Sequence, residues 1–294
     1  MVPERAHAGG RAHPVGRTCR AGIRILRREF FYNGGGLLNL ARRPFVEDFQ
    51  NPRNPIAFVH IPKTAGSAFI EYLVANIGDQ SKVAPPFMGD MTVTRDERSP
   101  YQLYWGHYDY FLLKGTGRKF TFITFLRDPL ARAISQWKSW SNPDNLTEAW
   151  LNVMEPYQIE ALRFAQTATL DEFVMSPNLY IEGHIRDVQT RYLADAPDRP
   201  DMLDSAKRNL EAVFQYFGIV ERFQESIELF QANFRNNALP YSVPPARENR
   251  SREVDANLSA AALARLRSLN SNDFELYVFA CRLFEERYRK VFGN

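Results

Sequence analysis

Cysteine is nearly absent from this sequence. Cys19 and Cys281 are the only two among 294 residues, the first in a basic N-terminal stretch and the second in an apolar helical pattern. Two cysteines cannot build the disulfide framework of a small secreted domain or a four-ligand zinc site. Clusters of Asp and Glu at metal-ligand spacing are also missing, so we expect no metal site.

Long hydrophobic runs and a strong charge of one sign are absent as well. No apolar run approaches the roughly 20 residues that a membrane-spanning helix needs, and the N-terminus lacks the apolar stretch of a secretory signal. The net charge is only +3, and much of it comes from arginines before residue 30. We therefore expect no transmembrane segment and no nucleic-acid partner.

The composition predicts a soluble globular chain with a distinct N-terminus. Residues 1–50 show no sustained periodicity and contain scattered arginines and a Gly34-Gly35-Gly36 break. We predict a flexible basic segment there, with a short helix near residues 23–31 as an option. Residues 51–294 are predicted to form a single domain.

A phosphate-binding loop is predicted at residues 60–67. A short apolar strand pattern ends at Pro62, and an apolar pattern of helical spacing begins at Phe69. Between them, small residues lie where a helix exposes unpaired N–H groups, and Lys63 adds a positive charge. The order differs from the Walker motif, in which the lysine follows the glycine. The alternative is an ordinary turn with a solvated lysine.

Residues 120–140 repeat this arrangement. The most apolar run of the chain ends at Leu126, and Asp128 and Pro129 suit the cap and first turn of a following helix. Arg127 at this junction presents a planar fork of donors to a phosphate, with Ser135 two turns along the helix. Arg132 could instead be a surface charge.

A third candidate lies between these two motifs. An aromatic strand pattern over residues 101–105 ends at Gly106, which places His107 at a strand tip, where active-site residues are common. The alternative is a histidine that is merely packed in a loop.

Two strand–loop–helix units in succession predict a parallel sheet with both anion sites at the carboxyl ends of its strands. We expect an α/β, P-loop-like three-layer fold, with a central parallel sheet flanked by helices and a helix-rich C-terminal half. Within that half, His184 and Arg191 could be ordinary surface or helix-end residues. The basic loop over residues 244–252 could close over a nucleotide's 3′-phosphate or bind an acidic acceptor, and a solvated linker is the favoured alternative.

These motifs resemble one family. Pro62-Lys63-Thr64-Ala65-Gly66-Ser67, Gly106-His107 and Leu126-Arg127-Asp128-Pro129 with Ser135 resemble sulfotransferases that use 3′-phosphoadenosine 5′-phosphosulfate, especially the carbohydrate group containing heparan sulfate 2-O-sulfotransferase. The likeness spans about residues 55–290. It includes Gln189-Thr190-Arg191, which resembles a Gln-Thr-Arg-x-Leu segment of related sulfotransferases and, with His184, is expected to help line an acceptor cleft. Trp105 departs from it, because that group has a His-Gly-His whose second histidine matches His107.

The resemblance implies a reaction and a set of site residues. A sulfuryl group would pass from 3′-phosphoadenosine 5′-phosphosulfate to a hydroxyl of a carbohydrate or glycolipid, without a metal. His107 would be the general base, and Lys63 would stabilise the leaving phosphate. Arg127 and Ser135 would bind the 3′-phosphate. The 5′-phosphosulfate would be held by Lys63, Thr64, Ala65, Gly66 and Ser67.

The sequence also leads to an expectation about cellular location and leaves two alternative functions open. Animal Golgi members of the group carry an N-terminal anchor, so its absence here leads us to expect a cytoplasmic enzyme. A nucleotide-dependent kinase and a non-catalytic glycan- or nucleotide-binding protein of the same fold remain as alternatives. The sequence leaves the acceptor and the oligomeric state open.

Overall fold

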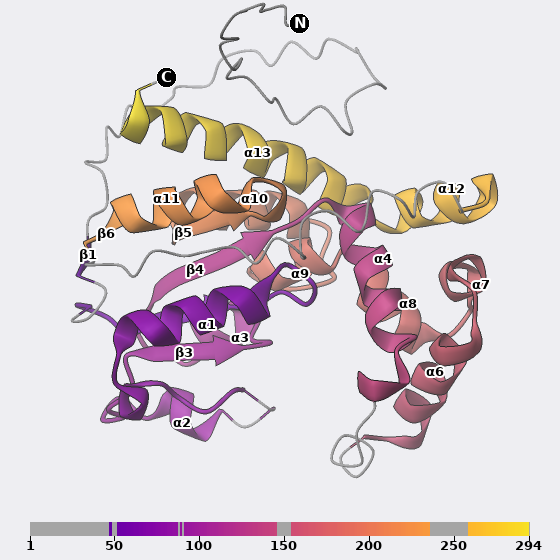
Figure 1. Ribbon diagram of the computed structural model, residues 1–294, viewed down its shortest axis with the longest axis horizontal. Coiled ribbons are helices and arrows are strands. Elements are labelled where there is room, and N and C mark those ends of the chain that lie inside the picture. The colour runs from indigo at the N-terminus through magenta and orange to yellow at the C-terminus, as the bar shows by residue number, and fades with distance from the viewer. Residues whose placement is uncertain are drawn as a thin grey trace, which may run out of the picture. The chain divides into compact units, whose positions relative to one another are not determined.

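A four-stranded parallel sheet forms the centre of the protein, as the computed structural model shows (Figure 1). The structure describes residues 47–48, 52–87, 89, 91–145, 154–235 and 258–293. The strand order is β3-β2-β4-β5. These strands are β2 (Ile56–Val59), β3 (Leu103–Gly106), β4 (Thr121–Leu126) and β5 (Phe214–Ile219). The predicted α/β fold with a central parallel sheet is confirmed.

The two central strands are apolar because both of their faces are covered. Every residue of β2 and of β4 is buried, as expected for a parallel sheet with helices on both sides. Val59 pairs with Gly106 on one side and with Thr124 on the other. The carboxyl ends of β2, β3 and β4 therefore lie at the same edge of the sheet.

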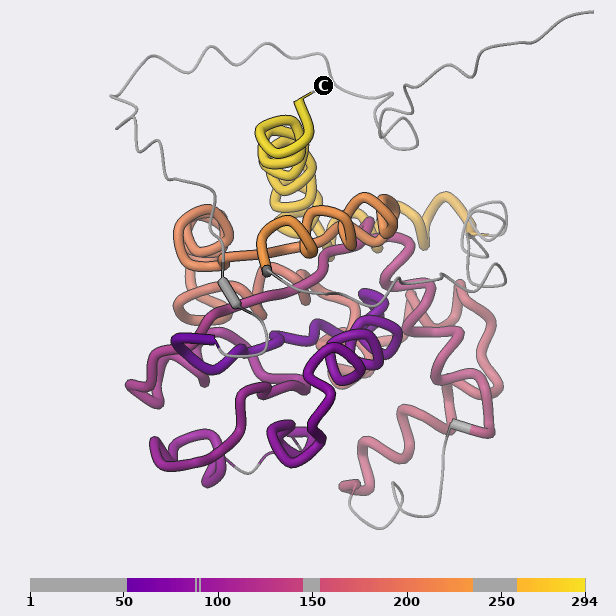
Figure 2. The backbone as a smooth tube through the Cα atoms, turned by 60° about the vertical axis from the view of Figure 1, so that its left-hand side comes forward, coloured from indigo at the N-terminus to yellow at the C-terminus, as the bar shows by residue number. Residues whose placement is uncertain are grey.

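Helices make up most of the remaining described residues (Figures 1 and 2). The longer ones before β5 are α1 (Gly66–Ile77), α4 (Pro129–Trp140), α6 (Pro156–Thr167) and α10 (Met202–Ala212). The shorter ones are α2 (Thr92–Arg95), α3 (Tyr110–Lys114), α7 (Leu170–Met175), α8 (Leu179–Ile185) and α9 (Val188–Leu193). After β5 come α11 (Phe223–Asn233), α12 (Ala260–Leu269) and α13 (Ser271–Phe292). Three single 3₁₀ turns span Gln80–Lys82, Pro143–Asn145 and Val220–Arg222.

Phe69 of α1 packs against the main core around the sheet. Its ring lies 5.2 Å from the ring of Phe58 on β2, 4.6 Å from that of Phe125 on β4 and 5.3 Å from that of Phe230 on α11. Buried aromatic rings in such contact contribute beyond their area. They fix the first helix against the two central strands.

A second apolar cluster lies beyond the carboxyl ends of the strands. There α4, α6, α7 and α8 form a helical group past the arrowheads of the sheet (Figure 1). Phe173, Ile181 and Leu266 are among the buried side chains that join these helices to α12. This group borders the edge of the sheet at which the predicted anion-binding loops begin.

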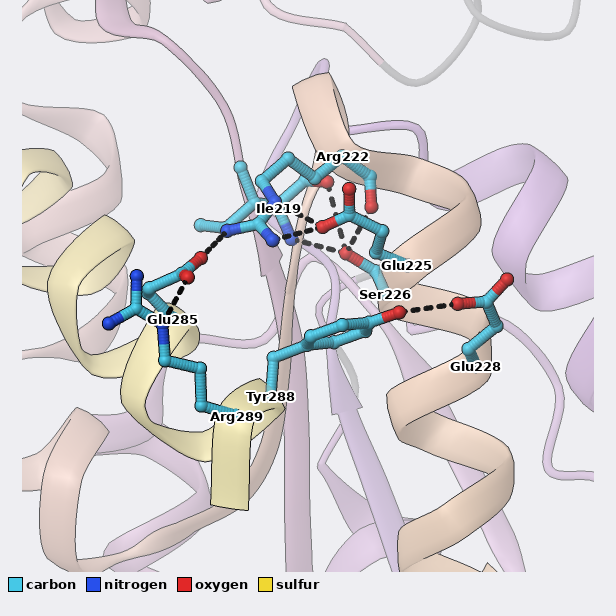
Figure 3. A network of polar contacts seen from close by, with 8 residues as sticks. All are labelled: Ile219, Arg222, Glu225, Ser226, Glu228, Glu285, Tyr288 and Arg289. Atoms are coloured by element: carbon cyan, nitrogen blue, oxygen red, sulfur yellow. Dashed lines mark hydrogen bonds and ion pairs between the residues drawn. The ribbon is translucent and has the colours of Figure 1, made fainter. Parts of the chain in front are cut away.

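Helix α13 covers α10 and α11 on the β5 side of the sheet (Figures 1 and 2). A polar network ties it to α11 (Figure 3). Arg222 donates to Glu285 of α13 at 2.6 Å and also pairs with Glu225, and the Tyr288 hydroxyl donates to Glu228 at 2.8 Å. The long C-terminal helix is thereby fixed to the sheet layer along its second half.

Two features differ from the sequence-based expectations. The Glu47–Asp48 pair forms a short strand, β1, parallel to β6 (Phe234–Arg235), inside the segment expected to be flexible. Arg132, for which a surface position was one possibility, is fully buried. Its Nη2 donates to the carbonyl oxygen of His184 at 3.0 Å, because helix α4 turns this residue toward α8.

Some predictions concern residues outside the described ranges. They are the remainder of the N-terminal segment, with its optional helix over residues 23–31, and the loop over residues 244–252. Among the described helices, none is long and apolar enough to cross a membrane.

Candidate functional site

The loop between β2 and α1 has the features of an anion-binding turn. Lys63 and Ala65 both adopt left-handed backbone conformations, with φ of 71° and 61°. Ala65 is the N-cap of α1, gives no side-chain cap, and the first turn of the helix carries no acidic residue. The first N–H groups of α1 therefore have no hydrogen-bond partner within the helix and can bind an anion.

The predicted loop residues differ in how they can contact a ligand. Thr64 is fully buried, and its hydroxyl donates to the carbonyl oxygen of Ile61 at 2.8 Å, so its side chain shapes the turn. Ser67 is exposed at the helix start, and Gly66 is buried. A Cβ atom at Gly66 would lie 1.8 Å from Nε2 of His60. The turn thus requires glycine at this position because the His60 ring occupies the space.

Arg127 joins the second predicted loop to the first. Its Nη1 donates to the carbonyl oxygen of Lys63 at 3.2 Å. Burial lowers the pKa of Lys63, and the positive charges of Arg127 and Arg132 lower it further. Three cationic side chains close together repel one another, so an anion bound between them would be stabilised.

The helix after Arg127 begins as the sequence predicts. Asp128 caps α4 by accepting from the N–H of Ala131 at 2.9 Å, and Pro129 occupies the first turn. Ser135 is half-buried on the same helix, two turns further along. Arg127 and Ser135 therefore come from one continuous strand–helix unit.

Two histidine rings lie together beside the first loop. The ring centroids of His60 and His107 are 4.7 Å apart. Nδ1 of His107 lies 2.8 Å from the carbonyl oxygen of His60. Because a carbonyl oxygen only accepts, Nδ1 carries the hydrogen, and the lone pair of the neutral ring is on Nε2.

The electrostatics of this pair favour neutral rings. Burial lowers the pKa of His60 to about 3, with further contributions from His107 and Lys63. His107 still reaches solvent, but desolvation by the surrounding protein lowers its pKa below 6.5; the hydrogen bond to His60 opposes this shift, and Lys63 adds to it. A neutral imidazole with a free Nε2 can accept a proton.

His184 lies in the last turn of α8. Nδ1 is bonded to the carbonyl oxygen of Tyr180 at 2.8 Å, and the ring packs 4.8 Å from that of Trp140. Burial lowers the pKa of His184; the hydrogen bond to Tyr180 opposes this shift, and the charges of Arg132, Arg191 and His107 add to it. The charge of His107 therefore influences the pKa of His184.

Other expected lining residues are placed differently. Gln189 and Thr190 are fully buried, so they cannot line an acceptor cleft, which corrects that expectation. Trp105 donates from its indole to the carbonyl oxygen of Ala84 at 2.9 Å. The second imidazole beside His107 belongs to His60.

The sequence assigned no role to the side chains of His60 and Glu221, and it assigned Gln189 to an acceptor cleft. His60 follows directly after β2, and its place at a strand end was a signal that could have drawn attention to it. Gln189 and Glu221 come from distant segments and contact the Arg127–Asp128 backbone. No spacing in the sequence indicates those contacts.

The hydrogen-bond donors and positive charges of this site suit an anionic nucleotide. Lys63, Arg127 and the N-terminus of α1 supply positive charge and N–H donors at one edge of the sheet. Within the described ranges, no group of three or more His, Cys, Asp or Glu is arranged to hold a metal ion.

Comparison with known proteins gives a consistent set of relatives. Residues 47–280 match the sulfotransferase family. Human heparan-sulfate 6-O-sulfotransferase 1 is 26% identical over 277 residues, covering 80% of this chain and 66% of that protein. The 1-B enzyme of Danio rerio is 27% identical over 280 residues, covering 80% and 67%. Human heparan-sulfate 6-O-sulfotransferase 3 is 25% identical over 292 residues, covering 83% and 60%.

These matches refine two expectations. The relatives are named as 6-O-sulfotransferases, and the chain spans about two thirds of their length or less. The expected cytoplasmic location is wrong, because the heparan-sulfate 6-O-sulfotransferase relatives are Golgi-resident enzymes.

Proposed function

Because the chain belongs to the sulfotransferase family, we propose that it transfers a sulfuryl group from 3′-phosphoadenosine 5′-phosphosulfate to a hydroxyl of a carbohydrate. Family membership favours this reaction over that of a nucleotide-dependent kinase. The relatives named for heparan sulfate support a glycan as the acceptor.

The contact between Arg127 and Lys63 carries the proposal. The guanidinium donates to the backbone of the first loop at 3.2 Å, so the two anion-binding loops meet. One ligand with two anionic ends, a 5′-phosphosulfate and a 3′-phosphate, accounts for both loops. Arg127 and Ser135 would bind the 3′-phosphate.

The first loop would bind the other end of the donor. The backbone N–H groups at Ala65, Gly66 and Ser67 and the Lys63 ammonium would hold the 5′-phosphosulfate. Lys63 would also stabilise the negative charge that develops on the phosphate oxygen when the S–O bond breaks. Thr64 would contribute through its backbone, because its hydroxyl is bonded to Ile61.

His107 would remove the proton of the acceptor hydroxyl. Its Nδ1 hydrogen is held by His60, which leaves Nε2 free to take that proton as the acceptor oxygen bonds to sulfur. The lowered pKa of His107 keeps the ring unprotonated at neutral pH. The proton would end on His107 and the bridging oxygen would leave with the phosphate.

Calorimetric titration tests the donor. The purified protein is titrated with 3′-phosphoadenosine 5′-phosphate, the product nucleotide, and separately with ADP and with ATP plus magnesium. We expect metal-independent binding of the bisphosphate and little binding of ATP. A preference for ATP with magnesium would contradict the proposal.

A transfer assay tests the reaction. Donor labelled in its sulfuryl group is incubated with the protein and with desulfated heparan sulfate, other polysaccharides and glycolipids in separate reactions. Label should appear in a glycan. Tight bisphosphate binding without transfer to any acceptor would instead support the non-catalytic alternative.

A further inference from the structure

A buried glutamine holds both polar groups of the Arg127 backbone. Oε1 of Gln189 accepts from the N–H of Arg127 at 2.8 Å, and Nε2 donates to the carbonyl oxygen of the same residue at 2.8 Å. Gln189 is fully buried on α9. The side-chain amide therefore makes the pair of backbone hydrogen bonds that a neighbouring strand would make. It fixes the backbone where β4 ends.

Asp273 in the first turn of α13 holds the backbone around this glutamine. One carboxylate oxygen accepts from the N–H of Gln189 at 3.1 Å, and the other accepts from the N–H and the hydroxyl of Thr190, both at 2.7 Å. Asp273 is itself fully buried. Its negative charge also raises the pKa of Arg132, which burial lowers to about 10.

A second connection runs from α13 to the next peptide unit. Oε1 of Glu221 accepts from the N–H of Asp128 at 3.0 Å, and its Oε2 accepts from the hydroxyl of Tyr277 at 2.7 Å. Burial raises the pKa of Glu221, and these hydrogen bonds oppose the rise. Asp273 and Tyr277 are four residues apart, so they lie on one face of α13.

We propose that Gln189 is a positioning residue that, anchored on α13 through Asp273, aims the guanidinium of Arg127 at the 3′-phosphate of the donor. This inference rests on the proposed function, because it takes Arg127 as the 3′-phosphate ligand. Arginine recognises phosphate through a planar fork, whose bonds depend on orientation. Without the hydrogen bonds from Gln189, the backbone of Arg127 would be free to shift, and the orientation of its guanidinium would vary.

The substitution Gln189→Leu removes both hydrogen bonds and keeps a similar volume. Two titrations are compared, one with 3′-phosphoadenosine 5′-phosphate and one with adenosine 5′-phosphate, which lacks the 3′-phosphate. We expect the affinity for the bisphosphate to fall roughly ten- to a hundredfold, with that for the monophosphate nearly unchanged. In turnover, KM for the donor should rise more than kcat falls.

Gln215→Leu is the matched control. Oε1 of Gln215 accepts from the N–H of Phe122 at 2.7 Å, so it also holds the backbone of β4, but at the opposite end of the strand. This variant should retain the preference for the bisphosphate. Thermal melting of both variants shows whether each is folded.

Three outcomes separate the possibilities. A selective loss of bisphosphate affinity in Gln189→Leu supports the proposal, whereas an equal loss for both nucleotides, or no loss, overturns it. If the unmodified protein shows no preference for the bisphosphate, the proposed function itself fails. If Gln189→Leu does not fold, Gln189→Glu takes its place, because it retains an acceptor for the N–H of Arg127: a selective loss of bisphosphate affinity in this variant supports the proposal, and an equal loss for both nucleotides overturns it.

A double variant completes the test. In an Arg127→Gln background, Gln189→Leu should have little further effect on bisphosphate affinity, because its effect acts through Arg127. Additive losses would overturn the positioning role.

Discussion

The imidazole of His107 is held by the backbone of His60, with 2.8 Å between Nδ1 and the carbonyl oxygen. His60 follows β2 and His107 follows β3, and these two strands are hydrogen-bonded neighbours. The parallel pairing thus brings the proposed base to the start of the loop that carries Lys63. The orientation of the base is set by main-chain geometry.

Replacing His107 by alanine should lower kcat by roughly a hundredfold or more, because general base catalysis contributes about that much. Binding of 3′-phosphoadenosine 5′-phosphate should change little, since His107 is proposed to contact the acceptor. Calorimetry and initial rates on the same preparation measure both. A variant with normal turnover would remove His107 from the mechanism.

Replacing Lys63 by alanine should lower kcat/KM by roughly a hundredfold, as for loss of one group that stabilises transition-state charge. Bisphosphate affinity should fall as well. Lys119→Ala is the control, because Lys119 is exposed in the turn before β4. Equal effects of the two substitutions would show that Lys63 acts only through the overall positive charge of the protein and makes no specific contact with the donor.

The pH profile of kcat/KM should be bell-shaped. His107 must be unprotonated and its pKa is lowered from 6.5, so activity should fall with decreasing pH at a midpoint below 6.5. Lys63 must be protonated and its pKa is lowered from 10.5, so activity should fall with increasing pH at a midpoint below 10.5. In Lys63→Arg the upper limb should move to higher pH, because guanidinium stays protonated. An unchanged upper limb in this variant would contradict the role of Lys63.

Gly66→Ala should destabilise the protein by about 1–3 kcal/mol, as overpacking does, because the new Cβ atom would lie 1.8 Å from Nε2 of His60. Gly183→Ala is the matched control: it also places alanine in a helix, but no atom lies within 4 Å of its Cβ position. That variant should be as stable as the parent, or more stable by up to about 1 kcal/mol. Urea denaturation compares the two, and equal effects would contradict the packing of His60 against the loop.

Acidification should destabilise the folded state partly through His60. The folded-state pKa is about 3, whereas an unfolded chain has a value near 6.5. Between these values the unfolded state binds more protons, so stability is lost as pH falls below about 6.5, by up to about 1.4 kcal/mol per pH unit from this residue. His60→Gln should therefore lose less stability than the parent between about pH 7 and about pH 5. Parallel losses in both proteins would show that His60 is protonated in the folded state.

Much of the fold could be predicted from local patterns. The continuous apolar runs of β2 and β4 and the small or capping residues after them indicate strand–loop–helix units, and parallel pairing follows from two such units in succession. The placement of Lys63 and Arg127 at one edge of the sheet was predictable for the same reason. Both residues lie at a junction that the sequence marks by itself.

The contacts between distant segments could not be predicted. Gln189 contacts the backbone of Arg127, 62 residues away in sequence, and Asp273 contacts the backbone of Gln189, 84 residues away. Their residue types alone do not show which N–H groups they meet. Arginine is usually a surface residue, yet Arg132 is buried and its guanidinium donates to a carbonyl oxygen of α8. Such placements depend on how helices pack after the sheet has formed.

The hydrogen bonds between β2 and β4 have an evolutionary consequence. The two loops proposed to bind the donor begin on adjacent strands, about 4.8 Å apart in a parallel sheet, so their spacing is inherited with the backbone. Helices α6, α7 and α8 lie outside that ladder, beyond the strand ends (Figure 1). Substitutions in those helices could exchange one acceptor for another over generations while the donor stays the same.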